Sequence, residues 1–456
     1  MTEVQQLARF VVSRRFEDLS SQAAESLKLR VLDALGCAIG ALEGAPVKAI
    51  RQELDEFGGN PLVSLIGGGR SAPDRAAFYN SALVRYLDFN DSYLAPLETC
   101  HPSDNVGSVL SASQYAGRDG KAFLTALGIA YQVQCRLSDE APVRAKGFDH
   151  TVQGSYGVAA GTAYALGLDA SRSANAVAIA GTAYNALRVA RTGNLSNWKG
   201  LAFPSAGWTA THAAFLARRG ITGPEAVFEG NKGFKEAIAG PFHIDWEQED
   251  LERVTRTVVK KFNAEIHSQA TLEGLHDLLR QHPIDPARIR TVVLNTFDVA
   301  YHIIGGGEEG GKKVIRTKEE ADHSLPYMMA VLLIDGQVLP AQYSPSRIAR
   351  PDVQALLQKV EVREKPEYSR RFPAEEACDI TVTMQDGAEY YIEKRDYEGF
   401  LTRPASWDFL SAKFHALAAP YAPEPLRSKI IDAVRTLDRH PILDLCLLLE
   451  AVGAQK

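Results

Sequence analysis

The sequence predicts a mainly helical protein that carries a smaller second domain of mixed helices and strands. Through roughly the first 250 residues, apolar and small residues recur at helical spacing between Gly and Pro breaks. After residue 250, runs of β-branched residues and a hairpin signal alternate with helical stretches, and helical spacing returns from residue 406. A chain of 456 residues is long enough for two or three domains with sizeable cores.

Composition narrows the class of protein. Hydrophobic residues make up 45% of the chain and charged residues 23%, as in ordinary soluble domains. A net charge of -6 without a dense Lys/Arg run argues against nucleic acid as a partner. We find no signal peptide and no stretch approaching the roughly 18 apolar residues of a membrane span. Five isolated cysteines without a CxxC pair then predict a cytoplasmic protein with no iron–sulfur or zinc site.

The N-terminal part has the pattern of a series of helices. In the first, apolar residues recur at three- and four-residue steps until Gly44 and Pro46 end it. The Ala- and Gly-rich helices that follow carry small residues that allow close helix–helix contact. The Gly-rich stretch 64–70 lacks the residues of a phosphate or dinucleotide loop, so we expect a turn there. Helices are expected over residues 22–43, 47–57, 74–88, 105–117, 121–137, 154–168, 173–191 and 206–219.

The part after residue 250 predicts an α+β domain of about 140 residues. Asp386-Gly387 between two β-branched runs indicates a hairpin, and the Gly-rich stretch 305–313 indicates a mobile loop. Strands are expected over residues 253–262, 289–297, 359–363 and 379–394, and helices over 268–281 and 319–335. The last stretch, 406–456, returns to helix, and we expect it to pack back on the first domain.

The stretch from Leu87 to Gly107, LDFNDSYLAPLETCHPSDNVG, is the most polar interruption of the helical part. One imidazole, that of His101, stands among several carboxylates and hydroxyls, a composition suited to proton transfer near neutral pH. Asp88 and Ser92 are four residues apart and would share a face if the preceding helix extends that far. The alternative is an ordered surface loop whose Asp and Ser residues cap helices.

Three further motifs carry cations or imidazoles. SNWKG (196–200) places Lys199 beside Gly200 and ahead of the Pro-broken start of the next helix, and a lysine near a helix N-terminus suits a carboxylate or phosphate. VVKKFNAEIHSQ (258–269) delivers lysines, Glu265 and His267 to the end of a strand. In ADHSLPYMMAVLLIDG (321–336), His323, Ser324 and Tyr327 precede an apolar helix, although Ser324 could simply cap it, with Pro326 in its first turn. Taken singly, a solvated lysine or an amphipathic edge would also explain the first two motifs.

Together these motifs predict a pocket with several cations, one or two imidazoles and a carboxylate. Such a pocket fits a di- or tricarboxylate from which a proton is removed next to a carboxylate, because lysines would stabilise the negative charge that develops. The sequence has no HExxH and no GxSxG, which argues against a zinc hydrolase or a serine hydrolase.

Over nearly the whole chain, and in the right order, these motifs resemble the MmgE/PrpD family. The resemblance is carried by LDFNDSYL…HPSDN, SNWKG, RRGITGPEAVFEGNKGF, KKFNAEIHSQ, ADHSLPYMMAVLLIDG and EGFLTRPASWDFLSAKF. It implies a large helical domain built from both chain ends (1–252 and 396–456) and a smaller inserted α+β lid domain (253–395). It also implies a homodimer, a site between the domains, and a reaction that needs no metal or other cofactor.

The resemblance also implies roles for single residues. His101 matches the histidine of the family's HPS motif and becomes the candidate for proton transfer, as acid or as base. Asp88 takes the aspartate of the LDF motif, and Ser92 stands where the decarboxylases of the family have a threonine. Lys199 and Lys260 would be catalytic carboxylate clamps. His267 and Tyr327 are further substrate-binding candidates, Tyr327 through the SLPY motif.

For the reaction, the resemblance implies a hydro-lyase acting on a citrate-like tricarboxylate. HPSDN and AEIHSQ favour dehydration of 2-methylcitrate to 2-methylaconitate, a step of propionate catabolism, and Glu265 stands where the decarboxylases have a second histidine. Asn263 replaces the usual proline of the family motif. The alternatives are decarboxylation of cis-aconitate, epimerisation of a small diacid, or a binding protein that keeps the fold without turnover.

Overall fold

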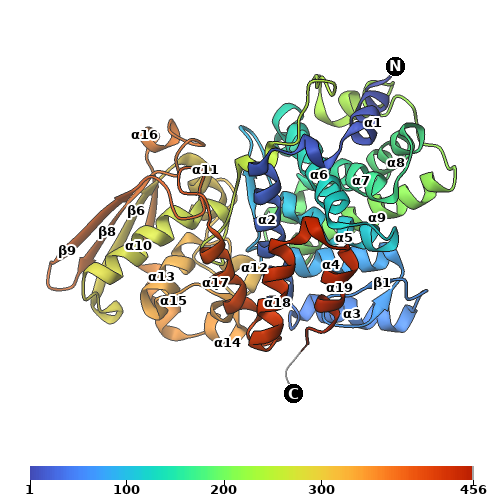
Figure 1. Ribbon diagram of the computed structural model, residues 1–456. Helices are drawn as coiled ribbons and strands as arrows, with labels where there is room; N and C mark the ends of the chain where they lie inside the picture. The colour runs from blue at the N-terminus through green and yellow to red at the C-terminus, as the bar shows by residue number, and fades with distance from the viewer. Residues whose placement is uncertain (454–456) are drawn as a thin grey trace. The chain divides into compact units, whose positions relative to one another are not determined.

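The computed structural model describes residues 1–453, and the chain folds into two compact units (Figure 1). Unit 1 comprises residues 1–190, 200–257 and 406–456, of which the last three are not described, and unit 2 comprises residues 191–199 and 258–405. The mainly helical class with a smaller α+β part is confirmed. That these units are independently folding domains with the predicted limits stays a prediction.

Unit 1 is built almost entirely of helices. Its helices are α1 (Glu3–Ser13), α2 (Ser21–Gly40), α3 (Ala45–Phe57), α4 (Pro73–Tyr86), α5 (Val106–Tyr115), α6 (Gly120–Glu140), α7 (Thr151–Leu166), α8 (Ala170–Ala183), most of α9 (Trp198–Arg218), α17 (Trp407–Ala418), α18 (Glu424–Arg435) and α19 (Ile442–Glu450). Two short hairpins, β1 (Val63–Ser64) with β2 (Arg70–Ser71) and β3 (Ser92–Leu94) with β4 (Thr99–Cys100), interrupt them.

The small residues of unit 1 do allow close helix packing. A Cβ atom on Gly157 would lie 2.8 Å from the backbone oxygen of Ala130, and one on Gly161 equally close to that of Ala126, so α7 fits against α6 only with glycine there. The C-terminal helices return to this unit as expected. Gly36 of α2 would place a Cβ 3.3 Å from the ring of Phe414 in α17, and Figure 1 shows the red C-terminal helices beside the blue α2.

Unit 2 combines one four-stranded sheet with short helices. Its strands are β6 (Ile289–Thr296), β7 (Val360–Glu364), β8 (Cys378–Met384) and β9 (Glu389–Lys394), in the order β7-β6-β8-β9. Strand β7 is parallel to β6, and β8 is antiparallel to both β6 and β9. The β8–β9 turn contains Gly387 with φ 90°, which confirms the predicted hairpin.

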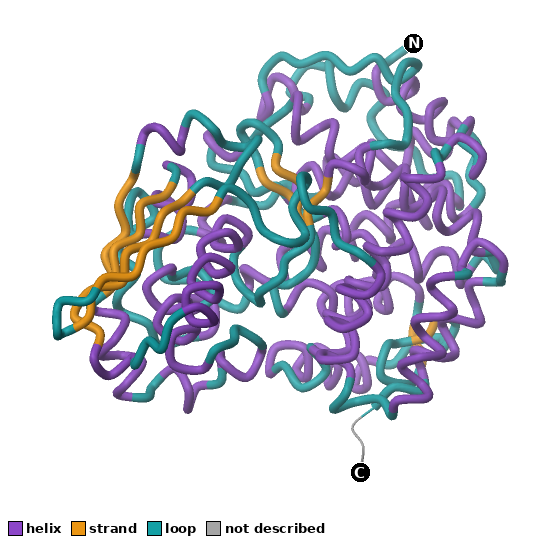
Figure 2. The backbone as a smooth tube through the Cα atoms, turned by 60° about the vertical axis from the view of Figure 1, so that its left-hand side comes forward, coloured by secondary structure: helices purple, strands orange, loops and turns teal. Residues whose placement is uncertain are grey.

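Helices of unit 2 pack against this sheet. Helix α10 (Gln269–Gln281) contacts β8 and β9, and α13 (Leu325–Asp335) contacts α10 and β7. Figure 2 shows the strands of this sheet in orange with purple helices beside them. Strand β8 is largely buried, whereas every second residue of the edge strand β9 is exposed. The remaining helices are α11 (Asp298–Ala300), α12 (Lys318–Ala321), α14 (Pro345–Ile348), α15 (Pro351–Gln358) and α16 (Pro366–Ser369).

Three predicted boundaries were wrong, and each affects a candidate site residue. The strand expected over 253–262 shrinks to β5 (Thr257–Val258), preceded by a 3-10 turn. Helix α8 ends at Ala183 rather than near 191, and α9 begins at Trp198, before Pro204, which the helix accommodates in its interior. The single helix expected over 319–335 is broken between α12 and α13, where Ser324 caps α13 and Pro326 lies in its first turn.

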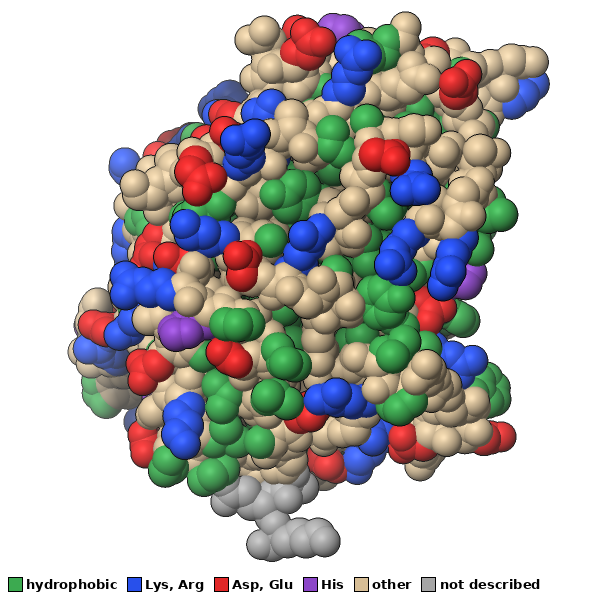
Figure 3. Space-filling model, turned by 45° about the vertical axis from the view of Figure 1, so that its right-hand side comes forward, with side chains coloured by type: hydrophobic (Ala, Val, Ile, Leu, Met, Phe, Trp, Pro, Cys, Tyr) green, Lys and Arg blue, Asp and Glu red, His purple; other side chains and the backbone are tan. Residues whose placement is uncertain are grey.

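The mixed charges on the surface and the limited hydropathy of the helices agree with the overall composition of the chain. On the face drawn in Figure 3, Lys/Arg and Asp/Glu side chains are interspersed with each other and with apolar groups. Within residues 1–453, none of the helices combines the length and the apolar character that crossing a bilayer requires.

Candidate active-site residues

The polar loop, residues 87–107, lies in unit 1, runs from the end of α4 into the first turn of α5, and is almost wholly buried. Helix α4 ends at Tyr86, and Asp88 adopts a left-handed backbone with φ 55°. Ser92 is then the first residue of β3. The condition for Asp88 and Ser92 to share one helix face is therefore not met, because the chain leaves the helix before either residue.

His101 and Ser92 are brought together by the β3–β4 hairpin. The Nδ1 atom of His101 lies 2.9 Å from the backbone oxygen of Asp91 and 3.0 Å from Oγ of Ser92. A carbonyl oxygen can only accept a hydrogen bond, so this contact assigns the proton to Nδ1. The Nε2 atom then carries the basic lone pair of the neutral ring. The ring also meets that of His150 edge-on at a centroid distance of 5.4 Å.

Asp88 is held by an arginine of the helix that precedes it. Arg85 donates from Nη1 to Oδ1 of Asp88 at 2.6 Å, and its Nε lies 3.5 Å from Oδ2 of Asp104. All three side chains are buried. Asn90 donates to Oδ1 of Asp104 and to Oγ of Ser103, each at 2.8 Å. Both ends of the polar loop are thus tied to each other by charge-assisted and neutral hydrogen bonds.

Asp91 and Lys413 fix the middle of the polar loop. The buried carboxylate of Asp91 accepts from the backbone N–H of Ser103 and from the hydroxyl of Tyr131, each at 2.9 Å. Its pKa is raised because burial penalises the charged form more than Arg30 nearby favours it. From α17, Lys413 donates to the backbone oxygen of Phe89 at 2.7 Å. Helix α17 therefore helps to position the segment that carries His101.

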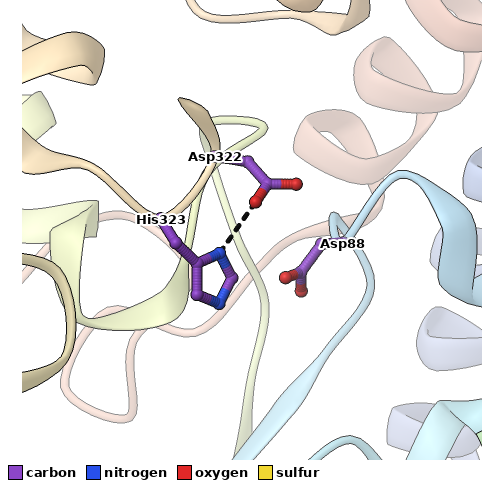
Figure 4. A group of neighbouring side chains, drawn as sticks. All are labelled: Asp88, Asp322 and His323. Atoms are coloured by element: carbon purple, nitrogen blue, oxygen red, sulfur yellow. Dashed lines mark hydrogen bonds and ion pairs between the residues drawn. The ribbon is translucent and has the colours of Figure 1, made fainter. Parts of the chain in front are cut away.

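Unit 2 gathers a second charged cluster around Asp322, in the break between α12 and α13. Lys199 Nζ lies 2.7 Å from Oδ1 of Asp322 and 2.8 Å from Nδ1 of His323. Nδ1 of His323 is itself 2.8 Å from Oδ1 of Asp322, and Figure 4 shows these two side chains turned toward each other. Lys318 takes the other oxygen, Oδ2, at 2.6 Å. Burial alone would raise the pKa of Asp322, but these cations hold it well below its usual range.

Glu265 and His267 form a second buried pair in unit 2. The carboxylate accepts from Nδ1 of His267 at 2.7 Å and from the backbone N–H of the same residue at 2.8 Å. Although burial opposes it, the charge of His267, with those of His323 and Lys260, lowers the pKa of Glu265 to about 2. The other ring nitrogen of His267, Nε2, is buried and makes no hydrogen bond with any residue of the described chain.

The remaining predicted residues take different positions. Lys260 is completely buried, two residues beyond the end of β5. Tyr327 is also buried, and its hydroxyl donates to the backbone oxygen of Gln342, so its phenol already serves the packing of unit 2. Burial raises the pKa of Tyr327, which keeps the hydroxyl protonated.

Two carboxylates of unit 2 were not predicted from the sequence. Asp322 belongs to the ADHS motif and is the centre of its cluster, but only its neighbours were singled out; a carboxylate beside a histidine just before a helix cap was the available signal. Glu376 is completely buried, and neither of its carboxyl oxygens makes a well-formed hydrogen bond within residues 1–453. Nothing in its local sequence, AEEACDI, indicates this burial.

The mainly helical unit holds a buried imidazole, and the α+β unit holds several lysine–carboxylate pairs. These are residue types that acid–base chemistry on organic anions uses. Residues 5–247 match the MmgE/PrpD N-terminal domain, and residues 262–439 match the MmgE/PrpD C-terminal domain. The chain belongs to the MmgE/PrpD family, which confirms the resemblance seen in its motifs.

Individual relatives carry the names of lyases. The chain is 28% identical to 2-methylcitrate dehydratase of Salmonella typhi over 82% of its own length and 81% of the relative. It is 27% identical to mitochondrial 2-methylcitrate dehydratase of Yarrowia lipolytica, covering 84% and 77% of the two chains. It is 26% identical to cis-aconitate decarboxylase of Mus musculus, covering 90% and 86%. A dehydratase-type function on a small carboxylate is therefore supported at family level.

Proposed function

We propose that this protein is a cofactor-independent hydro-lyase for a citrate-like tricarboxylate, with dehydration of 2-methylcitrate to 2-methylaconitate as its reaction. The observation that carries the proposal is the hydrogen bond from Nδ1 of His101 to the backbone oxygen of Asp91, which leaves Nε2 as the base. The names of the relatives support the substrate class. A homodimer and a cytoplasmic location stay predictions of the sequence.

In this reaction, a base removes the proton from the carbon next to a substrate carboxylate. The electron pair then forms the new double bond as the hydroxyl on the neighbouring carbon leaves, and protonation of that hydroxyl releases it as water. His101 is proposed as the group that transfers the proton, with Ser92 and Asp88 orienting it or the substrate. Lys199 and Lys260 would bind carboxylates and stabilise the negative charge that builds up during proton removal.

The test measures growth of the enoate absorbance with 2-methylcitrate, citrate and cis-aconitate for the wild-type protein and for His101→Asn. Asparagine can still donate an N–H near the position of Nδ1, so the variant preserves the loop contact while removing the base. We expect turnover of 2-methylcitrate by the wild-type protein and a loss in kcat of about 10²- to 10⁴-fold in the variant.

A matched control is His212→Asn, because His212 is an exposed histidine of α9 in the same unit, beside Asp74. It should leave kcat unchanged. Turnover by His101→Asn within a few-fold of wild type would refute the role of His101. Release of carbon dioxide from cis-aconitate would instead identify a decarboxylase, the function named for the mouse relative, and deuterium uptake with racemisation of a diacid would identify an epimerase.

A further inference from the structure

Asp91 holds the segment that carries His101 at two points, one through its backbone and one through its side chain. Its backbone oxygen lies 2.9 Å from Nδ1 of His101 and accepts the proton of that nitrogen. Its carboxylate accepts from the backbone N–H of Ser103 at 2.9 Å. Only Pro102 separates Ser103 from His101, and a proline restricts both its own backbone and that of the residue before it. The side chain of Asp91 therefore fixes the same short segment whose imidazole its carbonyl orients.

Tyr131, on helix α6, holds the carboxylate of Asp91 in turn. Its hydroxyl donates to Oδ2 of Asp91 at 2.9 Å, whereas Ser103 donates to Oδ1, so each carboxylate oxygen has its own donor. These three residues are buried in unit 1. Nε of Arg30 lies 3.9 Å from Oδ2 of Asp91, and this guanidinium is itself fixed on Thr257 by hydrogen bonds of 2.8 and 2.7 Å. A side chain with both oxygens engaged in a close-packed interior has little freedom to rotate.

The position of the Asp91 carbonyl decides which nitrogen of the His101 ring carries the proton. A neutral imidazole has one N–H and one basic nitrogen, and the hydrogen bond that one nitrogen makes fixes the role of the other. A carbonyl held against Nδ1 stabilises only the form that is protonated there. Oγ of Ser92, 3.0 Å from the same nitrogen, makes no such choice, because a hydroxyl can donate as well as accept.

We infer that Asp91 and Tyr131 are positioning residues of the proposed proton transfer, because together they hold the Asp91 carbonyl against Nδ1 and so keep Nε2 of His101 as the basic nitrogen. They act through the imidazole and need no contact with the substrate. The inference rests on the proposed function for its catalytic meaning, whereas the tautomer of His101 is a property of the protein without substrate. A helix outside the polar loop thereby sets the chemistry of a residue within it.

Nitrogen NMR of the full-length protein labelled with ¹⁵N-histidine tests the inference, because protonated and unprotonated ring nitrogens resonate far apart. Spectra are recorded under alkaline conditions that leave imidazoles neutral. The spectrum of His101→Asn identifies the His101 signals by their absence. The compared proteins are wild type, Tyr131→Phe, Asp91→Ala and Asp91→Asn, and kcat for 2-methylcitrate is measured for each.

We expect His101 of the wild-type protein to be protonated at Nδ1. Loss of one hydrogen bond in Tyr131→Phe should shift the tautomer ratio toward the form protonated at Nε2 by roughly 2- to 10-fold, and Asp91→Ala should shift it further. Asp91→Asn keeps an acceptor for the Ser103 N–H and a donor for the Tyr131 oxygen, so its ratio should stay near that of wild type. In each variant, kcat should fall by the fraction by which the form protonated at Nδ1 declines.

Tyr156→Phe is the matched control. Tyr156 is a buried tyrosine of α7 in the same unit, and its hydroxyl makes no hydrogen bond within residues 1–453. This variant should leave the His101 tautomer unchanged. A shift equal to that of Tyr131→Phe would overturn the inference, because a general loosening of the core would then explain both.

The remaining outcomes separate the inference from the proposed function. Wild-type His101 protonated at Nε2 overturns the inference, as does a wild-type tautomer in both Tyr131→Phe and Asp91→Ala. Turnover of 2-methylcitrate then decides the proposed function by itself. An Asp91→Asn ratio shifted as far as that of Asp91→Ala also overturns the inference, because hydrogen bonding would not be what holds the ring. A tautomer that depends on Tyr131 in a protein without turnover of any tricarboxylate supports the inference and refutes the hydro-lyase.

Discussion

At the scale of single residues, three imidazoles are oriented through the same ring nitrogen but by different partners. Nδ1 of His101 faces a neutral backbone oxygen, and Nδ1 of His267 faces a carboxylate. Nδ1 of His323 lies near both the carboxylate of Asp322 and the ammonium group of Lys199. A neutral acceptor orients the ring without favouring the imidazolium form by its charge. A carboxylate acceptor does favour the imidazolium form, because the two charges form an ion pair. This difference supports His101 as the group that takes up a proton and the other two histidines as electrostatic groups.

Glu376 is a carboxyl group of unit 2 that is completely buried. Burial, and then the negative charge of Glu265, raise its pKa well above the usual range, which favours the protonated carboxyl group in the folded protein. The unfolded chain ionises at a lower pH, so this group makes stability fall as pH rises above the ordinary glutamate pKa.

Glu376→Gln should therefore raise the free energy of unfolding at neutral pH relative to wild type, with the difference shrinking toward acid pH. Urea unfolding at several pH values measures it. The exposed Glu389→Gln in β9 serves as the control. A variant less stable than wild type at neutral pH, with a deficit that disappears in acid, would show that Glu376 is ionised and partnered in the native protein.

At the scale of elements, the sequence predicts structure well where local signals decide it. The hairpin at Asp386-Gly387 and the glycine-dependent packing of α7 on α6 are examples, because their turn chemistry and small residues are local signals. The breaks were harder. Asp322 and His323 leave the helical pattern because Ser324 starts a new helix, and Asp88 leaves it through a left-handed backbone. Neither of these two breaks interrupts the helical spacing of the apolar residues in the sequence.

The same limit applied to the candidate site. The charged motifs could be picked out because Lys199, His101 and Glu265 stand in polar sequence. The partners that fix them are distant in the chain and could not be read from spacing: Lys199 pairs with Asp322, and the polar loop is held by Lys413. Such pairings follow from tertiary packing, which a single sequence does not reveal.

Ser324 lets the element-scale argument be tested. Ser324→Ala removes the N-cap acceptor of α13 together with the hydroxyl that holds the carbonyl of Lys312. We expect a loss of about 1 kcal/mol in the free energy of unfolding from the cap, measured by urea unfolding. Ser324→Thr keeps both hydrogen bonds and should behave as wild type. Wild-type stability of the alanine variant would mean that the cap contributes nothing to α13.

At the scale of the whole molecule, several buried carboxylates are held in opposite ways in the two units, with Glu376 of unit 2 as an exception. In unit 1, Asp91 and Glu98 have raised pKa values, chiefly because burial penalises their charged forms. In unit 2, despite burial, cations lower the pKa values of Glu265 and Glu273 to about 2. A carboxyl group whose pKa is raised in the folded protein adds stability as pH falls. A carboxyl group whose pKa is lowered loses its stabilising contribution as pH falls.

Acid should therefore open unit 2 before unit 1. For Glu265, the folded pKa of about 2 against an ordinary 4.5 means that its stabilisation is complete above about pH 4.5 and is lost as pH falls through 2. The full contribution of this buried pair is on the order of 3 kcal/mol.

Hydrogen exchange at stepwise lower pH should show peptides of unit 2 losing protection first. Glu265→Gln should be less stable than wild type at neutral pH and nearly equal to it near pH 2, since both then lack the ion pair with His267. Simultaneous loss of protection in both units, or a Glu265→Gln protein whose deficit persists in acid, would mean that packing rather than these charges sets the acid stability of the fold.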